Sequence, residues 1–328
     1  MGIQKLEIKG FRSLRDVAWE PGRLNVIIGP NASGKSNLLR ALSLLQKAVQ
    51  GDLSQEIVRM GGLAPLLWNG EAQEIAWVVR TDPLEEGRDP IKEALTYELR
   101  LQQRGTTSAL RVDNALAGWS IYHDFRVDQQ APLRQSAVTR MEQRVAPDGQ
   151  NLVPVLHTLY TGNREFKKAL DEAMRAAFGP EYEEMVFPTV ADQRVQLCIR
   201  WRSLCTEQSA ADLSNGTIRF LLLCAILANP DPGALIAIDE PEVGLHPSML
   251  PVIAELAEDA ADRTQVILTT HSPQLLDAFT SEPPVTTVTQ WVDGATRLAV
   301  VDGEELRRWL KEYSLGALFR SGELEGMV

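Results

Sequence analysis

Eight consecutive residues near the N-terminus have the types and spacing of a phosphate-binding loop. Gly29 to Ser36 satisfy the pattern G-x-x-x-x-G-K-[ST], between an apolar strand predicted over 24–28 and a helix predicted over 36–49. The two glycines allow the backbone to wrap a phosphate, and the N–H groups at the helix start form an anion site. We expect Lys35 to reach the β- and γ-phosphates and the Ser36 hydroxyl to complete a Mg²⁺ shell.

A second group of reactive side chains follows an apolar strand predicted over 235–238. Asp239 and Glu240 end this strand, and ligands of open α/β folds bind at the carboxyl ends of strands. We expect Asp239 to hold Mg²⁺, mostly through water, and Glu240 to act as the general base toward a water molecule. A solvated acidic turn is the alternative, and the phosphate-binding loop upstream favours the catalytic interpretation.

Two further polar segments occur at element boundaries. Ser214 and Gly216 precede an apolar helix predicted over 217–228, so they form either a second anion cradle or a plain helix cap. His271 follows a strand predicted over 266–270. It is either a satisfied polar residue or a sensor of the γ-phosphate, and its place after the Asp-Glu pair favours the sensor.

The remaining elements predict an α/β fold with two lobes, mixed and mainly parallel sheets, a short helical insertion and no long coiled coil. Strand-like alternation dominates the first third, and strands alternate with helices in the final third. We expect an N-terminal lobe over 1–114, a mainly helical insertion over 115–185 and a C-terminal lobe over 186–328. The further predicted strands are 4–8, 17–19, 75–80, 97–102 and 109–112, and the helices of the middle and end are 151–160, 164–178, 248–262 and 273–279.

Composition limits the partners of this 328-residue chain. A formal net charge of −11, from 44 acidic and 33 basic residues, argues against a strongly basic surface for nucleic acid or anionic membrane. Two groups of arginines could still form a local basic groove, and the alternative is that they lie on solvated faces of strands. The first group is Arg100, Arg104 and Arg111, and the second is Arg194, Arg200 and Arg202. Three cysteines without metal-ligand spacing, no apolar signal core and no long apolar run predict a cytoplasmic protein that does not span a membrane.

The order of these motifs resembles that of the ATP-binding cassette (ABC) ATPase superfamily, and most closely its RecF/SMC/OLD-like branch. Leu6 to Leu14 resemble the N-terminal strand and turn of that branch, and Glu240 to Pro247 resemble its OLD-type D-loop. The segment 306–316 is similar to the end of small stand-alone ATPases of this branch. The segment 115–185 matches nothing in the family pattern, and too few residues follow His271 for the Toprim nuclease domain of OLD proteins.

Some positions depart from the family pattern or stay open. The segment Leu213 to Thr217 resembles the signature motif of the superfamily, and we call it the signature. It has Asn215 and Thr217 where transporters usually have Gly and Gln, which fits the non-transporter branch. Gln73 and Gln143 are both candidates for the Q-loop glutamine, and neither is preferred. His246 is either structural or an interface residue.

The resemblance implies a Mg²⁺-dependent ATPase that forms a head-to-tail homodimer with ATP between the subunits. Ser214 and Gly216 of one subunit would contact the γ-phosphate held by the other, and Arg12 and Ser13 match nucleotide-contacting positions. The implied nucleotide-binding residues are Arg12, Ser13, Asn31, Gly34, Lys35, Ser36, Asn37, Ser214 and Gly216; the metal residues are Ser36 and Asp239, and the catalytic residues are Glu240 and His271.

The output of such an ATPase stays open between three alternatives. The first is a switch in a defence or stress system with a partner effector protein, which the negative charge favours. The second is a RecF-like DNA-binding ATPase in repair, and the third is an ATP-binding scaffold that presents 115–185 to a partner. An intact Glu240 argues against the scaffold.

Overall fold

A six-stranded sheet forms the middle layer of the protein, in a computed structural model that describes residues 2–83, 94–102, 118–190, 193–280, 283–301 and 304–327. Its strand order is β16-β15-β3-β14-β13-β6, in which β16 is antiparallel to β15 and the other pairs are parallel. The bounds are β3 Leu24–Ile28, β6 Trp119–Tyr122, β13 Leu235–Asp239, β14 Gln265–Thr269, β15 Val285–Val292 and β16 Ala295–Val301. The three central strands are almost wholly buried, because this sheet is covered on both faces.

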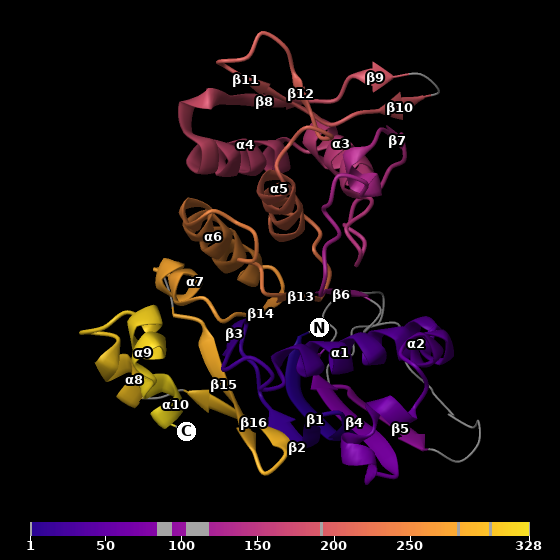
Figure 1. Ribbon diagram of the computed structural model, residues 1–328, viewed down its shortest axis with the longest axis vertical. Helices are drawn as coiled ribbons and strands as arrows, with labels where there is room; N and C mark the ends of the chain where they lie inside the picture. Colours follow the sequence, from indigo (N-terminus) through magenta and orange to yellow (C-terminus); the bar gives the residue numbers. More distant parts are fainter. Residues whose placement is uncertain are drawn as a thin grey trace.

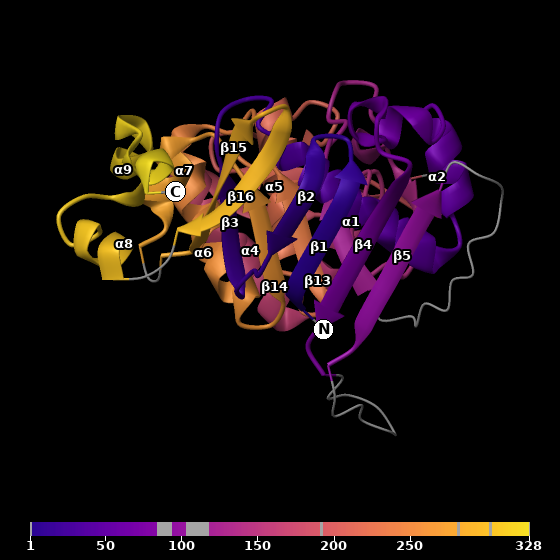
Figure 2. The ribbon, with the colours of Figure 1, turned by 90° about the horizontal axis from the view of Figure 1, so that it is seen from below.

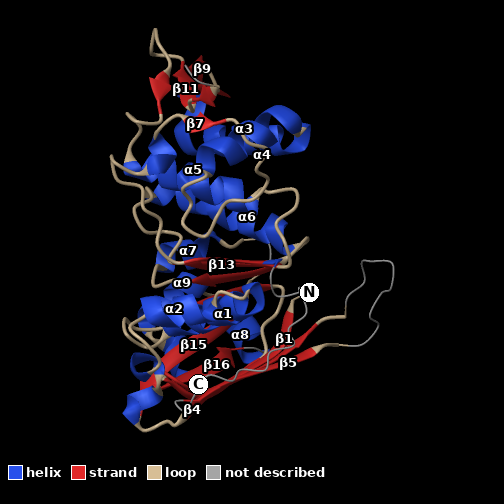
Figure 3. Ribbon diagram, turned by 90° about the vertical axis from the view of Figure 1, so that its right-hand side faces the viewer, coloured by secondary structure: helices blue, strands red, loops and turns tan. Residues whose placement is uncertain are grey.

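A second, antiparallel sheet lies below the first, with helix α1 (Lys35–Gln50) between them (Figure 3). Its strand order is β2-β1-β4-β5, and burial alternates along each strand because one face packs on α1. Figure 2 shows the outer face of this sheet beside the β15–β16 hairpin. The bounds are β1 Ile3–Phe11, β2 Leu14–Trp19, β4 Glu74–Thr81 and β5 Thr96–Gln102, and the short elements between β3 and β4 are α2 Leu53–Arg59, η1 Ala64–Leu66 and η2 Trp68–Gly70.

An upper lobe of three helices and two small sheets stands on the other face of the main sheet (Figure 1). Helix α6 (Leu250–Ala261) lies between this lobe and the main sheet. The helices of the lobe are α3 Leu152–Gly162, α4 Arg164–Phe178 and α5 Asn215–Leu227. The short elements are η4 Pro132–Arg134, β7 Ala137–Val138, η5 Gly179–Glu181, β8 Tyr182–Val186, β9 Thr189–Val190, β10 Arg194–Val195, β11 Cys198–Trp201 and β12 Gln208–Ser209.

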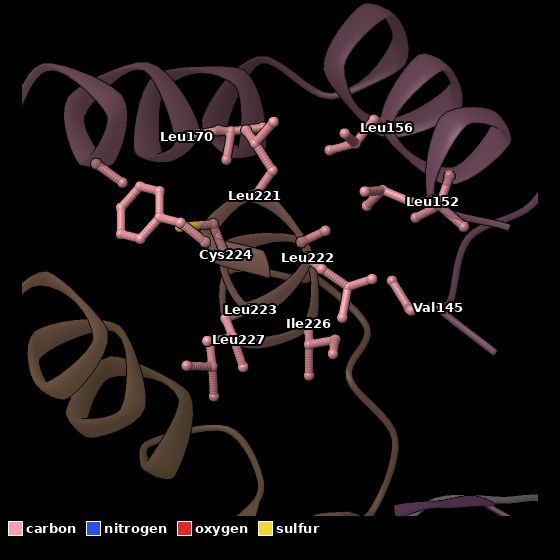
Figure 4. Close-up of a cluster of buried hydrophobic side chains, with 14 of the residues drawn as sticks. Val145, Leu152, Leu156, Leu170, Leu221, Leu222, Leu223, Cys224, Ile226 and Leu227 are labelled. Atoms are coloured by element: carbon pink, nitrogen blue, oxygen red, sulfur yellow. The ribbon is translucent and has the colours of Figure 1, made fainter. Parts of the chain in front are cut away.

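Helix α5 is the centre of the upper core. It is apolar on nearly all sides, and such a helix is stable only when neighbours surround it. Figure 4 shows Leu156 of α3 and Leu170 of α4 directed toward α5, with Leu221 and Leu222 facing them. The burial of this helix fixes the position of its N-terminal end, where Ser214 is the cap.

Four short helices close the molecule beside β15 and β3. They surround a smaller core that includes Val26 and Leu318. Their bounds are α7 Pro273–Ala278, α8 Glu304–Trp309, α9 Leu315–Ser321 and α10 Glu323–Gly326, and the turn η6 Pro247–Met249 precedes α6. No helix in the described ranges combines the length and the apolar character needed to cross a bilayer.

The predicted fold class is confirmed, and most elements lie within two residues of their expected bounds. The β15–β16 hairpin was not predicted, and the expected strand 109–112 falls outside the described residues. Pairing also crosses the predicted domain boundaries at 115 and 185. β6 pairs with β13 in the main sheet, and β8 pairs with β11. We propose instead that the upper lobe begins after β6 and ends with α5.

A buried leucine on α5 tests the upper core. Leu222→Ala should lower the free energy of unfolding by about 2–5 kcal/mol, because it removes a fully buried side chain and leaves a cavity. Leu204→Ala in the loop between β11 and β12 is the control, since Leu204 is 49% exposed and should cost no more than about 0.5 kcal/mol. Urea denaturation followed by circular dichroism measures both, and equal midpoints would contradict the assignment of α5 as the core helix.

Candidate nucleotide-binding site

The carboxyl ends of β3, β14 and β13 meet at one edge of the main sheet. Ile27 pairs with Thr269, and Thr269 pairs with Asp239, so the three strands end at nearly the same level. A cavity of about 900 Å³ opens at this edge, within the range of small-molecule sites. Nine of the predicted site residues line it: Arg12, Ser13, Asn31, Gly34, Lys35, Ser36, Asn37, Glu240 and His271.

The loop between β3 and α1 is held in a shape that requires glycine at its end. Gly34 has a φ of 107°, and a Cβ there would lie 2.0 Å from Thr296 Oγ1. Thr296 Oγ1 donates to the Ser33 carbonyl at 2.8 Å, and the hydroxyls of Ser33 and Thr289 are 2.5 Å apart. The β15–β16 hairpin thus supports the loop from behind, and the first residues of α1 line the cavity, where the start of a helix favours an anion.

Lys35 lies almost wholly inside this loop, with 5% of its surface exposed. Its Nζ donates to the carbonyls of Gly29 at 2.8 Å and Pro30 at 3.1 Å. Burial lowers its pKa, and the carboxylates of Glu240 and Asp239 act in the opposite direction. The side chain therefore places a cation at the base of the cavity.

Arg12 adds a second cation that lacks a full set of partners. It has a φ of 46°, and its Nε is buried with no hydrogen-bond partner among the described residues. Burial lowers its pKa, and the nearby charge of Arg40 lowers it further. Two guanidinium groups that repel each other beside a phosphate-binding loop fit a polyanionic ligand. Ser13, next in the chain, accepts from Asn37 Nδ2 at 2.8 Å.

Asp239 lies behind the loop, where it meets Ser36. Burial opposes the ionisation of Asp239, but the neighbouring side chains of His123, Thr269 and Ser36 outweigh it and lower its pKa, and the Thr269 hydroxyl donates a hydrogen bond to Asp239 Oδ1. The site thus pairs a carboxylate with a hydroxyl, and such oxygen ligands are those that Mg²⁺ prefers when phosphate oxygens and water complete its shell. The residues present therefore fit the predicted metal.

Glu240 and His271 face each other across the ends of β13 and β14. Glu240 Oε1 lies 3.1 Å from His271 Nδ1. Glu240 has a φ of 48°, and three hydrogen bonds hold this strained backbone: its N–H donates to the carbonyl and the hydroxyl of Thr269, and its carbonyl accepts from Arg219 Nη2 at 3.0 Å. The carboxylate is thereby aimed into the cavity.

Besides Asp239, which lies behind the loop, two predicted residues are absent from the lining of the cavity. Ser214 and Gly216 do not line it, although both are described, and Ser214 is exposed at the start of α5. The Ser214 hydroxyl accepts from the Thr217 N–H at 3.0 Å, so it does act as a helix cap. Gln73 and Gln143 do not line the cavity either.

Three site residues carried no clear signal in the sequence. His123 follows β6, and its Nδ1 lies 3.8 Å from Asp239 Oδ2. Trp68 and Trp291 line the cavity beside the phosphate-binding loop. The dipeptide Asp293-Gly294 between two alternating runs would have predicted the hairpin that carries Trp291.

The two tryptophans form an aromatic wall of the cavity. Trp68 Nε1 donates to the Gly294 carbonyl at 3.2 Å, which ties η2 to the β15–β16 turn. The Arg15 guanidinium stacks on the Trp68 ring at 4.7 Å. Trp291 is 56% exposed. An exposed indole at this place can stack on a purine whose phosphates occupy the loop.

Family models of ATPase domains match two parts of the chain, which together carry most residues of this cavity. Residues 92–277 match a family model described as an AAA domain, putative AbiEii toxin of a type IV toxin–antitoxin system, and residues 1–75 match a model described as an AAA ATPase domain. The first match covers more than half of the chain, so the protein belongs to this family of AAA-domain ATPases.

Short segments are similar to two curated proteins. The chain is 46% identical over 50 residues to the DNA replication and repair protein RecF of Moorella thermoacetica, a match that covers 15% of this chain and 13% of that protein. It is 42% identical over 43 residues to an OLD nuclease of Thermus scotoductus, which covers 13% of this chain and 8% of the nuclease. The matched segments thus span less than a sixth of either relative.

Solved structures share the fold over almost the whole chain. An SMC head bound to the C-terminal winged-helix domain of ScpA has a TM-score of 0.65 at 16% identity, covering 94% of this chain and 100% of that one. The SMC head domain of Thermotoga maritima has a TM-score of 0.54 at 18% identity and covers 92% and 100%. The protein therefore has the fold of an SMC head, and these similarities support the predicted resemblance to ABC-type P-loop ATPases of the RecF/SMC/OLD branch.

Replacement of the loop lysine tests the phosphate subsite. Lys35→Ala should raise the dissociation constant for a fluorescent ATP analogue about 10- to 100-fold, because it removes charge-assisted hydrogen bonds to phosphate. Lys47→Ala, further along the same helix, should leave the constant unchanged. Equal binding by the two variants would place the phosphates elsewhere.

Tryptophan emission tests the aromatic wall. ATP should change the intrinsic fluorescence of the protein, and the change should shrink in Trp68→Phe and in Trp291→Phe because these indoles line the cavity. Trp201→Phe in the upper lobe is the control and should retain the full change. An undiminished response in both cavity variants would show that the base lies away from this wall.

Proposed function

We propose that this chain hydrolyses ATP in a site that is completed only when two copies associate head to tail. The observation that carries the proposal is the position of the signature. Ser214 and Gly216 lie outside the cavity of their own chain at the N-terminal end of α5, where Ser214 is exposed and Gly216 is half-buried. A helix N-terminus favours anions, so this end suits a γ-phosphate held by a second copy.

The cavity supplies the other groups that hydrolysis needs. Lys35, Arg12 and the start of α1 bind and orient the phosphates. A magnesium ion held by Ser36 and Asp239 would neutralise part of the negative charge that develops on the departing ADP. Glu240 accepts the proton of the attacking water, the bond between the γ-phosphorus and the bridging oxygen breaks, and ADP and inorganic phosphate leave. His271 lies beside Glu240 Oε1, where it would contact the γ-phosphate of bound ATP.

Such a site works as a switch between an open and a closed dimer. The γ-phosphate contacts both copies, so the closed form has contacts that the open form lacks, and hydrolysis removes them. The family description as a putative toxin of a type IV system and the net charge of −11 support an output in defence or stress through a partner effector protein.

A DNA-binding ATPase is the second candidate. The 46% identity to RecF over 50 residues favours it. It predicts duplex binding whose affinity falls steeply with salt, because bound phosphates release counterions. Binding that is absent at low salt would leave the partner-effector output.

A mixing experiment tests the composite site. Ser214→Arg should bind ATP normally and yet fail to dimerise, because its defect lies in the contact with the other copy. Lys35→Ala should fail to bind ATP. A mixture of the two should recover ATP-dependent heterodimers, since one pairing unites an intact phosphate loop with an intact Ser214.

Sedimentation velocity with and without ATP measures this recovery, and Ser203→Arg in the loop after β11 is the matched control for Ser214→Arg, because Ser203 is also exposed. Ser214→Arg protein that dimerises alone with ATP would contradict the head-to-tail arrangement. A mixture that stays monomeric would contradict it as well.

A further inference from the structure

Arg134 is a buried arginine in the upper lobe whose hydrogen bonds converge on the loop before α5. It is 1% exposed, and it lies in η4, away from the nucleotide cavity. Its Nη1 donates to the carbonyls of Ala210 at 2.9 Å and Leu213 at 2.6 Å, and its Nη2 donates to Asn215 Oδ1 at 2.5 Å. Its Nε donates to the Val127 carbonyl at 2.9 Å.

All four acceptors are carbonyl oxygens, so no carboxylate in these contacts balances the buried charge. Arginine stays protonated in proteins, and a buried cation is costly unless its donors are satisfied. Here the N–H groups of the planar guanidinium donate to three oxygens of the loop before α5, which must keep one fixed arrangement for all three bonds to form. A lysine has a point charge and cannot hold several acceptors in one plane.

The contacts enclose Ser214 from both sides. The Leu213 carbonyl and the Asn215 side chain are both bound to Arg134, and the residue between them is exposed. The buried Leu213 side chain and the Ser214 cap fix the loop further. Asn215 stands where transporters usually have glycine, and its amide oxygen gives the arginine an acceptor that glycine lacks.

We propose that Arg134 is the positioning residue of the signature, and that it holds Ser214 and Gly216 in the arrangement that receives the γ-phosphate of a second copy. This inference rests on the proposed head-to-tail dimer. Arg134 touches neither nucleotide nor reacting atoms in this account. It acts by reducing the number of loop conformations that must be lost when the dimer closes.

Loss of Arg134 should therefore affect dimerisation but not the binding of ATP to the monomer. A chain without Arg134 keeps its own phosphate loop intact and binds ATP as a monomer. Its loop at 210–216 is mobile, so the closed dimer forms less readily. A merely structural role would instead lower both properties together through loss of folded protein.

The test uses the full chain with Glu240→Gln, which should retain ATP and stay closed. Arg134→Met, Arg134→Lys and Asn215→Ala are added to this parent. Arg126→Met is the control, because the Arg126 side chain is exposed and forms an ion pair with its near neighbour Asp128 rather than a contact with the loop before α5. Hydrogen exchange of the ATP-free monomer is followed for peptides that cover 210–217, and dimerisation with ATP is followed by sedimentation.

We expect Arg134→Met to raise both the exchange rate of 210–217 and the dimer dissociation constant by about tenfold or more, as loss of hydrogen bonds to a charged group implies. ATP binding by the monomer should stay unchanged. Arg134→Lys should restore part of the loss. Asn215→Ala removes a single acceptor and should shift both quantities in the same direction, which keeps the test decisive if Arg134→Met does not fold.

Two results would overturn the assignment of Arg134. One is an unchanged exchange rate at 210–217 in Arg134→Met and Asn215→Ala. The other is a loosened loop with an unchanged dimer dissociation constant. A parent that stays monomeric with ATP would overturn the head-to-tail dimer itself, and the exchange data of the monomer distinguish that failure from a failure of Arg134 to order the loop.

Discussion

The parallel alignment of β3, β14 and β13 is the constraint on which the site depends. Because Ile27, Thr269 and Asp239 are paired in register, the loops that follow the three strands leave the sheet at the same edge. The phosphate-binding loop, the Asp239-Glu240 pair and His271 therefore meet although up to 242 positions separate them in the chain. Burial of these strands on both faces makes a slip in register costly, since it would expose apolar side chains.

Two other parts of the molecule bear on this edge of the sheet: one supports the phosphate-binding loop, and the other holds the loop that carries Ser214. The β15–β16 hairpin supports the phosphate loop through Thr289 and Thr296. Helix α5 carries the signature at its N-terminal end, and its burial in the upper lobe gives that end a rigid base. In the proposed head-to-tail dimer such a rigid base would favour the contact between copies, because disorder in the loop before α5 would oppose closure.

The sequence predicted those parts of the site that are continuous in the chain. Gly29 to Ser36 and Asp239-Glu240 are motifs whose residue types follow from their chemistry, and periodicity located the strands and helices that flank them. Contacts between distant segments carried no local signal. Thr296 supports Gly34 from the far end of the chain, and Arg134 reaches Asn215 only because the upper lobe folds between them.

The domain division that we propose from strand pairing differs from the predicted one for the same physical reason. The segment 115–185 looked separate because its helices carry no motif, yet its first strand completes the main sheet and its last strand pairs beyond residue 185. Strand pairing is decided by neighbours that are remote in the chain. Composition and periodicity therefore could not show which sheets contain β6 and β8, or which lobe each strand belongs to.

The central claim is that one copy holds an incomplete hydrolytic site. Steady-state ATP hydrolysis per subunit, measured over a wide range of protein concentrations with Mg²⁺ present, tests it most directly. The account predicts that activity per subunit rises with concentration and then reaches a plateau as dimers saturate. Activity per subunit that is substantial and constant down to concentrations at which sedimentation shows only monomer would contradict it.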